Sequence, residues 1–217
     1  MSVPEVEEGE ELEKMLLSTG IRVGTPVKTK YMAPFIVKAN PEGLYILDMD
    51  KTLQRIDVAA TFISRTPLSK VAVCSAREYG KTPVEKFCEL TGALTILGRF
   101  MPGTFTNPLL PSYIEPELVL VTDPQADQQA VIEATRAGLA VIAISNSDNF
   151  TSKVDLVIPA NNRGRRALAT VYWLLAKAVL SKTDQIKAEE QQIDKFIFRD
   201  KEYKIDDFET KLVEEVS

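Results

Sequence analysis

The segment whose spacing is most suggestive of chemistry is Asp-Met-Asp-Lys-Thr at residues 48–52, which directly follows the hydrophobic run 44–47. Two carboxylates one residue apart at the end of a strand can act as a nucleophile and as a general acid and base in phosphoryl transfer. Ser75 follows a later hydrophobic run and can bind a phosphate through its hydroxyl group. Asp123 and Asp127 follow another run and can supply carboxylates that hold Mg²⁺. Together these residues raise the hypothesis of magnesium-dependent phosphate hydrolysis.

The pattern resembles the DxDxT opening motif of haloacid-dehalogenase-type phosphohydrolases, with Asp48 as the nucleophile and Asp50 as the acid and base. Turn and capping chemistry explains the same residues without catalysis, because Asp is favoured where a parallel strand leaves a sheet and Thr52 is suited to cap the following helix. Asp123 precedes a proline, which is itself a signature of a helix start. Short motifs with free positions also match by chance, and that family's catalytic lysine and cap insertion have no clear counterpart here. The phosphohydrolase therefore remains the alternative hypothesis, and we expect no phosphate release.

Composition excludes several other kinds of site. The chain has no histidine, which removes histidine-based triads, histidine metal sites and imidazole proton shuttles. Cys74 and Cys88 are too few for a disulfide framework or a cysteine-only zinc site, and each lies in an apolar pattern typical of the core. Neither a GxGxxG motif after a strand nor a Walker-type phosphate-binding motif is present. We therefore expect no cofactor and no metal site built on histidine or cysteine.

The net charge of −5 at pH 7 divides unevenly along the chain. Residues 1–20 carry six acidic residues and one lysine, and residues 181–217 carry seven basic and eleven acidic residues. Residues 21–180 carry eighteen basic and fourteen acidic residues, so a mildly basic body lies between two acidic ends. If its cations are grouped on the surface, such a body can bind an anionic partner. If they are scattered, they are simply solvated.

Short hydrophobic runs rich in β-branched residues recur along the body of the chain. They are nearly continuous rather than alternating, which is typical of strands buried on both faces of a parallel sheet. The runs are residues 44–47, 71–74, 94–97, 118–121, 140–144 and 156–158. Helical patterns follow Thr52, Asp123 and Asn162. This order predicts an α/β fold with a doubly wound, mainly parallel sheet of about five strands, flanked by three or four helices, and a further helix near residues 10–17.

Two long segments fit neither a helix nor a strand. Residues 20–34 are basic and contain two prolines, and residues 98–116 contain four prolines with Phe100, Phe105 and Tyr113 among them. Loops of this length in a compact domain are usually functional or disordered, and the prolines favour a pre-shaped surface. No apolar run is long enough to cross a membrane, and the acidic start of the chain does not resemble a secretory signal.

Blocks spread over residues 20–180 resemble, in the same order, those of one ribosomal family. They are GIRVGT at 20–25 followed by KTKYMAPFI, GLYILDMDKT at 43–52, SAREYGKTPVEKF at 75–87, GRFMPGTFTNP at 98–108, EPELVLVTDPQADQQA at 115–130 and VDLVIPANNRGRRALATVYWLLAKAVL at 154–180. The chain is similar to the S2 family of the small ribosomal subunit, known in eukaryotes as SA or laminin-receptor precursor, and its archaeal branch fits best. The resemblance implies a flavodoxin-like sheet, no catalysis and a structural role in a 30S-type subunit.

The resemblance also implies partners and a location. Family members bind small-subunit ribosomal RNA between the head and the body near the mRNA exit, lie beside other ribosomal proteins and join late in assembly. We therefore expect a cytoplasmic, ribosome-bound protein that supports translation as a monomer within the ribosome, without a membrane partner. The first block usually has His where this chain has Arg22, so a contact particular to imidazole is in doubt, although arginine still offers phosphate a cation and a donor fork.

The predicted RNA contacts lie in the two irregular loops and at the start of the last long helix. Three arginines crowd that helix start, where backbone N–H groups favour phosphate but positive charge opposes the helix dipole. Replacing them should therefore leave stability unchanged or slightly higher. Loop cations beside aromatic rings suit RNA, although Phe100 and Phe105 serve equally well as anchors to the core. The predicted RNA-binding residues are Arg22, Lys28, Lys30, Tyr31, Arg99, Asn107, Asn162, Arg163, Arg165 and Arg166.

The chain divides into three predicted parts. Residues 1–19 form an acidic N-terminal extension with a short helix, residues 20–180 form the α/β ribosomal-protein domain, and residues 181–217 form a charged C-terminal extension. The ends carry most of the acidic excess and little apolar pattern, so proteases should trim both and leave a body near residues 12–185. Trimming should also strengthen nonspecific RNA binding, because it removes negative charge.

Overall fold

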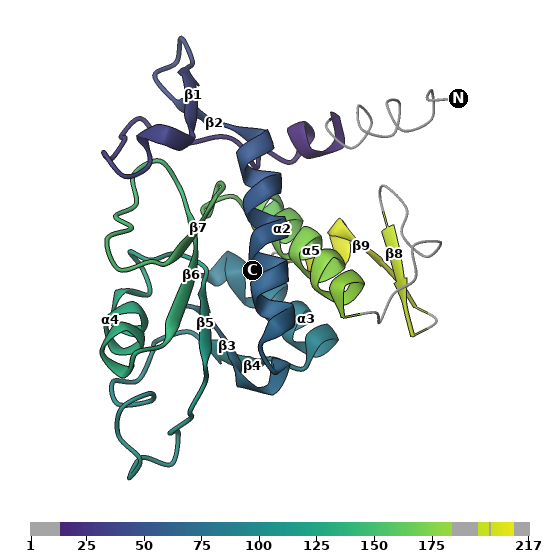
Figure 1. The fold of residues 1–217 in the computed structure, drawn as a ribbon. Coiled ribbons are helices and arrows are strands. Elements are labelled where there is room, and N and C mark those ends of the chain that lie inside the picture. Colours follow the sequence, from purple (N-terminus) through teal and green to yellow (C-terminus); the bar gives the residue numbers. More distant parts are fainter. Residues whose placement is uncertain (1–13, 184–194, 200, 211–217) are drawn as a thin grey trace, which may run out of the picture.

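The computed structural model describes residues 14–183, 195–199 and 201–210, and a five-stranded sheet lies at its centre (Figure 1). The strands are β3 (Val71–Ser75), β4 (Leu94–Leu97), β5 (Leu118–Val121), β6 (Ala140–Ser145) and β7 (Leu156–Pro159). Every neighbouring pair runs parallel, in the spatial order β4-β3-β5-β6-β7. The predicted parallel sheet is confirmed, and its strand order is flavodoxin-like.

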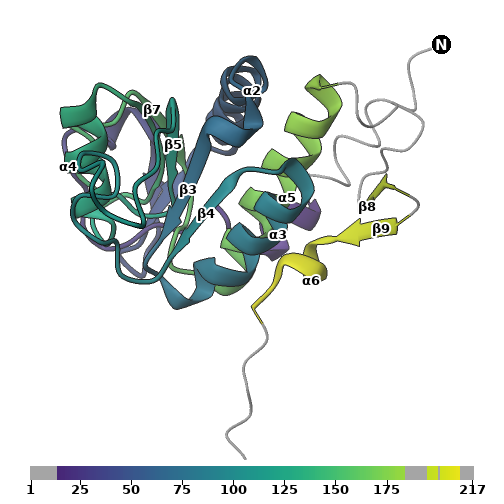
Figure 2. The ribbon, with the colours of Figure 1, turned by 90° about the horizontal axis from the view of Figure 1, so that it is seen from below.

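Helices cover both faces of this sheet (Figure 2). α2 (Met49–Arg65), α3 (Lys81–Thr91) and α5 (Arg165–Lys182) lie on one face, and α4 (Gln128–Ala137) lies on the other. Because successive side chains of a strand point to opposite faces, Val73 of β3 packs in the core with α2, α3 and α5, whereas its neighbour Cys74 packs with Ala130 and Ala134 of α4. The doubly wound α/β fold is therefore confirmed.

The first hydrophobic run does not belong to the main sheet, and that part of the strand prediction is wrong. β2 (Tyr45–Leu47) pairs antiparallel with β1 (Ile36–Ala39) in a separate two-stranded sheet. Gly43 lies in the turn between them at φ +82°, and its N–H donates to the Asn40 carbonyl oxygen at 2.9 Å. A turn this tight joins antiparallel strands, since a parallel pair needs a connection of about a dozen residues or more. The run at 156–158, within β7, supplies the fifth strand instead.

The helix that follows this hairpin begins at a different residue from the one predicted. Asp48, not Thr52, is the N-cap of α2, and its Oδ1 accepts the Lys51 backbone N–H at 3.4 Å. Thr52 is buried inside the helix, where its hydroxyl group donates to the Pro159 carbonyl oxygen at 2.6 Å. The side chain that the local pattern assigned to a cap therefore joins α2 to the end of β7.

The start of α4 also lies later than predicted, at Gln128 with Asp127 as the preceding residue. Asp123 lies in the turn before the helix, where its Oδ1 accepts the Gln125 N–H at 2.9 Å, and the same carboxylate also binds Arg77 and Asn149 from other segments. α5 follows Asn162 as predicted.

Short 3-10 turns cover Ala33–Phe35, Leu68–Lys70 and Glu78–Gly80. Residues 14–18 are helical, and the rest of the helix predicted near residues 10–17 lies outside the described residues. In the described part of the chain, no helix has the length and apolarity of a membrane span.

A small C-terminal unit packs against α5 (Figure 2). It consists of the antiparallel hairpin of β8 (Lys195–Phe198) and β9 (Lys201–Lys204), followed by α6 (Ile205–Phe208). Phe196 and Phe208 are fully buried, and the Trp173 indole N–H donates to the Tyr203 carbonyl oxygen at 3.1 Å. Core side chains thus come from within the predicted C-terminal extension, so we now expect proteases to leave residues 195–210 attached. The boundaries at residues 19 and 180 stay predictions.

Candidate nucleic-acid interface

Buried polar side chains hold the loops together at the carboxyl end of the main sheet. Asp123 follows β5 and is fully buried, and its Oδ2 accepts a hydrogen bond from the Arg77 Nε at 2.6 Å. The Asn149 amide donates to Asp123 Oδ1 at 2.9 Å, which ties the β6–β7 loop to the same carboxylate. Proteins with this strand order bind ligands where the order reverses, which here is between β3 and β5. In this chain the Arg77–Asp123 ion pair lies at that position.

A second aspartate supports the same region. Asp127 is buried, and its Oδ1 accepts the Ala76 N–H at 2.7 Å, while its Oδ2 has no hydrogen-bond partner. Burial raises the pKa of Asp127 to about 6, and the charge of Asp123 adds to that rise, although the hydrogen bond from Ala76 opposes it. Asp127 is thus a connector between the ends of β3 and β5.

The structure places the residues of the phosphohydrolase hypothesis in two different sheets, and among the described residues no group of three or more carboxylates could hold a metal ion. Asp48 caps α2 at the end of the small antiparallel sheet, and its Oδ2 lies 3.3 Å from the Lys51 Nζ. Ser75, Asp123 and Asp127 lie instead at the carboxyl ends of β3 and β5 in the main sheet. A nucleophile and its metal carboxylates must converge on one phosphate. Because these residues belong to two sheets, we assign Asp48 a structural role as the cap of α2.

The loop of residues 20–34 is fixed to the loop after β6. The Thr25 N–H donates to the Ser147 Oγ at 2.9 Å, and the Thr29 hydroxyl group donates to the Asn149 carbonyl oxygen at 2.9 Å. Gly24 passes so close to β2 that a Cβ atom there would lie 2.6 Å from the Tyr45 carbonyl oxygen. These contacts make the loop a shaped surface, as its prolines predicted.

Four of the predicted RNA contacts project from this loop. Lys28, Lys30 and Tyr31 are exposed, and Arg22 is half-buried. The Lys28 Nζ lies 5.2 Å from the centre of the Tyr45 ring. Within the described residues none of these three cations forms an ion pair. Their charge is therefore available to an anionic partner.

The loop of residues 98–116 is anchored by its aromatic rings. Phe100 and Phe105 are buried against α4 with ring centres 5.0 Å apart, so they belong to the core and do not offer a stacking surface. Glu133 of α4 accepts the Gly103 N–H at 2.6 Å. The two predicted contacts in this loop, Arg99 and Asn107, are exposed, and Asn107 Oδ1 accepts the Leu109 N–H at 3.1 Å.

The arginines at the start of α5 are each matched by a carboxylate. Arg163 forms an ion pair with Asp148 of the β6–β7 loop. Arg165 Nε lies 2.6 Å from Glu209 Oε1, and Arg166 lies 3.6 Å from Glu209 Oε2 and 3.7 Å from Asp206 Oδ1. The predicted cluster of unopposed cations is therefore not what the structure shows. Its charge is compensated by acids that lie far from it in the sequence.

Asn162 lies within the fold and not on its surface. Its side chain is fully buried, and its amide donates to the Ile144 carbonyl oxygen at 3.2 Å and to Asn149 Oδ1 at 3.0 Å. The neighbouring Asn161 accepts the Gly164 N–H at 3.2 Å, and its own amide donates to the Gly20 carbonyl oxygen at 3.2 Å. The two asparagines hold the entry to α5 against the loops, so Asn162 positions the surface without reaching it.

Comparison with known proteins identifies the family of this chain. The model of the family described as ribosomal protein S2 matches residues 111–182. The small ribosomal subunit protein uS2 of Nitrosopumilus maritimus is 58% identical over 205 residues, which cover 94% of this chain and 95% of that protein. This chain belongs to the ribosomal protein S2 family. The uS2 protein of Cenarchaeum symbiosum is 50% identical over 99% of this chain and 99% of its own length. The uS2 protein of Thermofilum pendens is 54% identical over 77% of this chain and 78% of its own length.

Membership in the S2 family means that the chain is a structural ribosomal protein and not an enzyme. These archaeal relatives also confirm the archaeal branch predicted from the sequence blocks. In this S2 protein the Asp-Met-Asp-Lys-Thr segment is the capped start of α2. Several structural residues escaped the sequence analysis, among them Arg77, Asn149, Asn161 and Glu133. A signal existed for Glu133 alone, since a carboxylate within the apolar stripe of a helix must find hydrogen-bond donors when buried.

Proposed function

We propose that this chain is a structural constituent of the small, 30S-type ribosomal subunit that binds ribosomal RNA through its loop surface. The observation that carries the proposal is the loop of residues 20–34, which presents Arg22, Lys28 and Lys30 without ion pairs among the described residues of an S2-family chain. Phosphates attract such cations, and backbone contacts of this kind fix the register of a protein on RNA.

The ten predicted contacts then fall into groups with different roles. Arg22, Lys28, Lys30 and Tyr31 are the proposed primary contacts, and Arg99 and Asn107 extend them along the loop of residues 98–116. The Arg163 side chain is about half exposed and contacts RNA with its exposed part. Arg165 and Arg166 reach RNA only if Glu209 and Asp206 are displaced, and Asn162 acts by positioning. This grouping follows from the burial and the ion pairs of each residue.

The proposal extends to location and partners. The protein lies between the head and the body of the subunit near the mRNA exit, joins late in assembly and supports translation there as a monomer. Its partners are small-subunit ribosomal RNA and neighbouring ribosomal proteins, and its compartment is the cytoplasm. Support for these details comes from the resemblance of the chain to its family, and from relatives that carry the name of a small-subunit protein.

Sedimentation tests the proposal directly. Lysate from cells that express the chain is separated on a sucrose gradient, and each fraction is probed for the chain. We expect it to sediment with free small subunits and with whole ribosomes, and to leave both at high salt, because phosphate contacts weaken as salt rises. A chain that stays at the top of the gradient at low salt overturns the proposal.

A further inference from the structure

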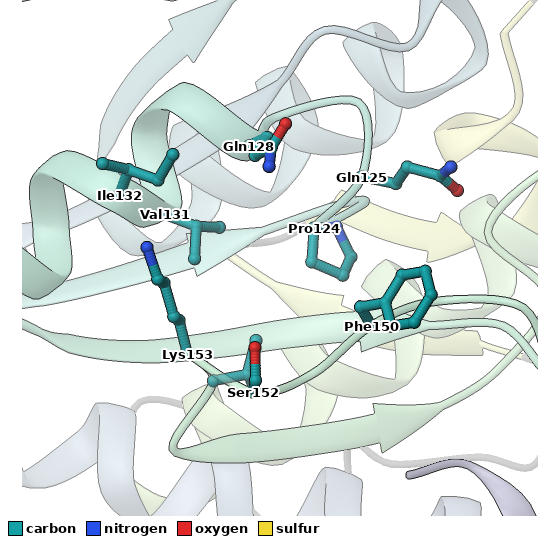
Figure 3. Close-up of a pocket in the computed structure, with 9 residues that line it drawn as sticks. Pro124, Gln125, Gln128, Val131, Ile132, Phe150, Ser152 and Lys153 are labelled. Carbon is teal, nitrogen blue, oxygen red and sulfur yellow. The ribbon is translucent and has the colours of Figure 1, made fainter. Parts of the chain in front are cut away.

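A cavity of about 260 Å³ lies between α4 and the loop that joins β6 to β7 (Figure 3). It is lined on the α4 side by Pro124, Gln125, Gln128, Val131 and Ile132, and on the loop side by Phe150, Ser152, Lys153 and Val154. Apolar side chains and amide or amine groups thus share one small space. Sites for drug-sized ligands have volumes of roughly 300–1,000 Å³, so this cavity suits a smaller, flat group.

Phe150 forms one wall of the cavity and is 67% exposed. In the part of the chain that the structure describes, its ring pairs with no other aromatic ring. The backbone on both sides of the ring is held, because Thr29 donates to the Asn149 carbonyl oxygen at 2.9 Å and the Val154 N–H donates to the Thr151 carbonyl oxygen at 3.2 Å. A ring that is exposed and already positioned costs little entropy to use as a stacking surface.

The charge around the cavity is positive. The nine lining residues include no carboxylate, and Lys153 is exposed and forms no ion pair with any described residue. Of the two acids that flank the loop, Asp148 pairs with Arg163. Asp155 is exposed and keeps its charge, although its Oδ2 accepts the Val141 N–H at 2.8 Å, and it does not line the cavity. The rim therefore favours a ligand that carries negative charge beside its flat part.

The cavity also continues the proposed RNA surface. The loop that carries Phe150 is the one to which Thr25 and Thr29 attach the loop of residues 20–34. Lys28, Lys30 and Tyr31 therefore lie beside this loop, and Figure 1 shows the two loops next to each other on the side of α4. The β6–β7 loop thus both holds the lysine-bearing loop and lines the cavity.

We propose that the cavity binds one unpaired base of ribosomal RNA, which stacks on Phe150 while an adjoining phosphate lies at Lys153. This proposal rests on the proposed function. Unpaired bases are recognised by stacking on aromatic rings and by hydrogen bonds to their edges. The Gln125 and Gln128 amides can donate to and accept from any base edge. An apolar protein side chain is the less favoured occupant, because it would leave the cation beside the ring without an anionic partner.

The test uses the full chain and a labelled single-stranded RNA oligonucleotide that contains 5-iodouridine. Phe150→Leu keeps most of the apolar volume but removes the aromatic face, and should weaken binding by about 5- to 150-fold, the range expected for one stacked base. Phe62→Leu is the matched control, since Phe62 is an exposed phenylalanine on α2, and it should bind like the wild type. Ultraviolet crosslinking followed by mass spectrometry should place the adduct on Phe150.

A gain-of-signal variant adds an independent measurement. The only tryptophan, Trp173, is fully buried, so Phe150→Trp introduces an exposed indole whose fluorescence should be quenched when RNA stacks on it. The quenching should be absent in the wild type.

The possible failures are distinguishable. If the wild type binds the oligonucleotide and Phe150→Leu binds equally well, with no adduct on Phe150, the base site is overturned and the proposed function stands. If the wild type does not bind at low salt, the proposed function fails as well. If Phe150→Leu binds RNA normally but no longer enters subunits assembled with the full set of ribosomal proteins, the occupant is a protein and the proposal is overturned.

Discussion

The arginines at the start of α5 and the lysines of the two adjoining loops differ in what faces them. Arg163, Arg165 and Arg166 stand close together in the sequence, but Asp148, Asp206 and Glu209 compensate their charge. Lys28, Lys30 and Lys153 are spread over two loops, and no ion pair with a described residue neutralises them. The denser cluster is therefore the weaker anion site, because the field that a ligand meets is a sum over both signs of charge.

The C-terminal unit causes this difference. α6 brings Asp206 and Glu209 over α5, and Phe208 is fully buried beneath it. The hydrophobic anchor fixes the acids in place, so two of the arginines gain structural partners. Among the described residues no acid pairs with the loop lysines, so they keep their charge for a partner.

The largest effect should come from removal of the anchor. Phe208→Ala deletes a fully buried aromatic ring and should lower the free energy of unfolding by about 3–5 kcal/mol. It should also speed hydrogen exchange in residues 201–210 and strengthen RNA binding, because Arg165 and Arg166 lose their acidic cover. Chemical unfolding measures the first effect. Leu109→Ala, at a position 91% exposed, is the control and should change stability by no more than about 0.5 kcal/mol. Equal effects of the two variants would show that the unit is not part of the folded body.

The second effect concerns the arginines themselves. Replacing Arg165 and Arg166 together by Ala leaves the Glu209 side chain, 15% exposed, without a cation and should cost about 1–3 kcal/mol of stability. This outcome differs from the unchanged or slightly higher stability that the helix dipole alone predicted for replacement of all three arginines. Adding Glu209→Gln to the double variant should restore part of the loss, since it removes the uncompensated charge. A melting temperature at or above that of the wild type would contradict this prediction and indicate that the arginines are free to bind an anion.

The third effect concerns the open lysines. Replacing Lys28 and Lys30 by Ala should leave stability within about 0.5 kcal/mol. It should lower the salt dependence of RNA binding by about one to two units of slope, because each phosphate contact contributes about 0.7–0.9. Titrations with single-stranded RNA over a series of KCl concentrations give the slope. Arg65→Ala with Lys70→Ala, next to the opposite end of β3, removes the same charge and should leave the slope unchanged. Equal slopes in both variants would show that Lys28 and Lys30 contact RNA no more than cations elsewhere on the surface do.

The smallest effect is a pH dependence that involves neither cation group. Because the pKa of Asp127 is raised in the folded state, folding favours its protonated form, and this contribution is lost as the pH rises through about 6. Stability should therefore fall by on the order of 1 kcal/mol between pH 5 and pH 7. Asp127→Asn should remove this slope and leave RNA binding unchanged. Denaturant titrations at both pH values test it, and an identical slope in the variant would assign the pH dependence to another group.

Local patterns predicted most of the main sheet, and the exception is instructive. The runs that became β3 to β7 are apolar on both faces because both faces are covered by helices. The run that became β2 has the same composition, yet it pairs with β1 across the turn at Gly43. A short apolar run does not reveal its partner strand, and only the turn before it indicated an antiparallel hairpin.

The site was predicted less completely for a related reason. Loop composition located Lys28, Lys30 and Tyr31, because prolines and cations outside the hydrophobic pattern mark a shaped surface. The partners of Arg165 and Arg166 had no local signal, since α6 follows a charged stretch that looks like an extension. Phe208 was visible as an aromatic residue, but its burial depends on the surface that α5 offers it.

By itself, then, the sequence determined the α/β class, the five runs that became the strands of the main sheet, the two irregular loops and, through its ordered blocks, the S2 family. Each of these follows from residues close together in the chain, whose spacing sets which face is apolar and where the backbone turns. The tertiary structure alone decided that Asp48 caps α2, that Asn162 is internal and that acids near the C-terminus cover two arginines. Those outcomes depend on pairs of residues brought together by packing, and the energy of such a pair cannot be assigned before both partners have a place.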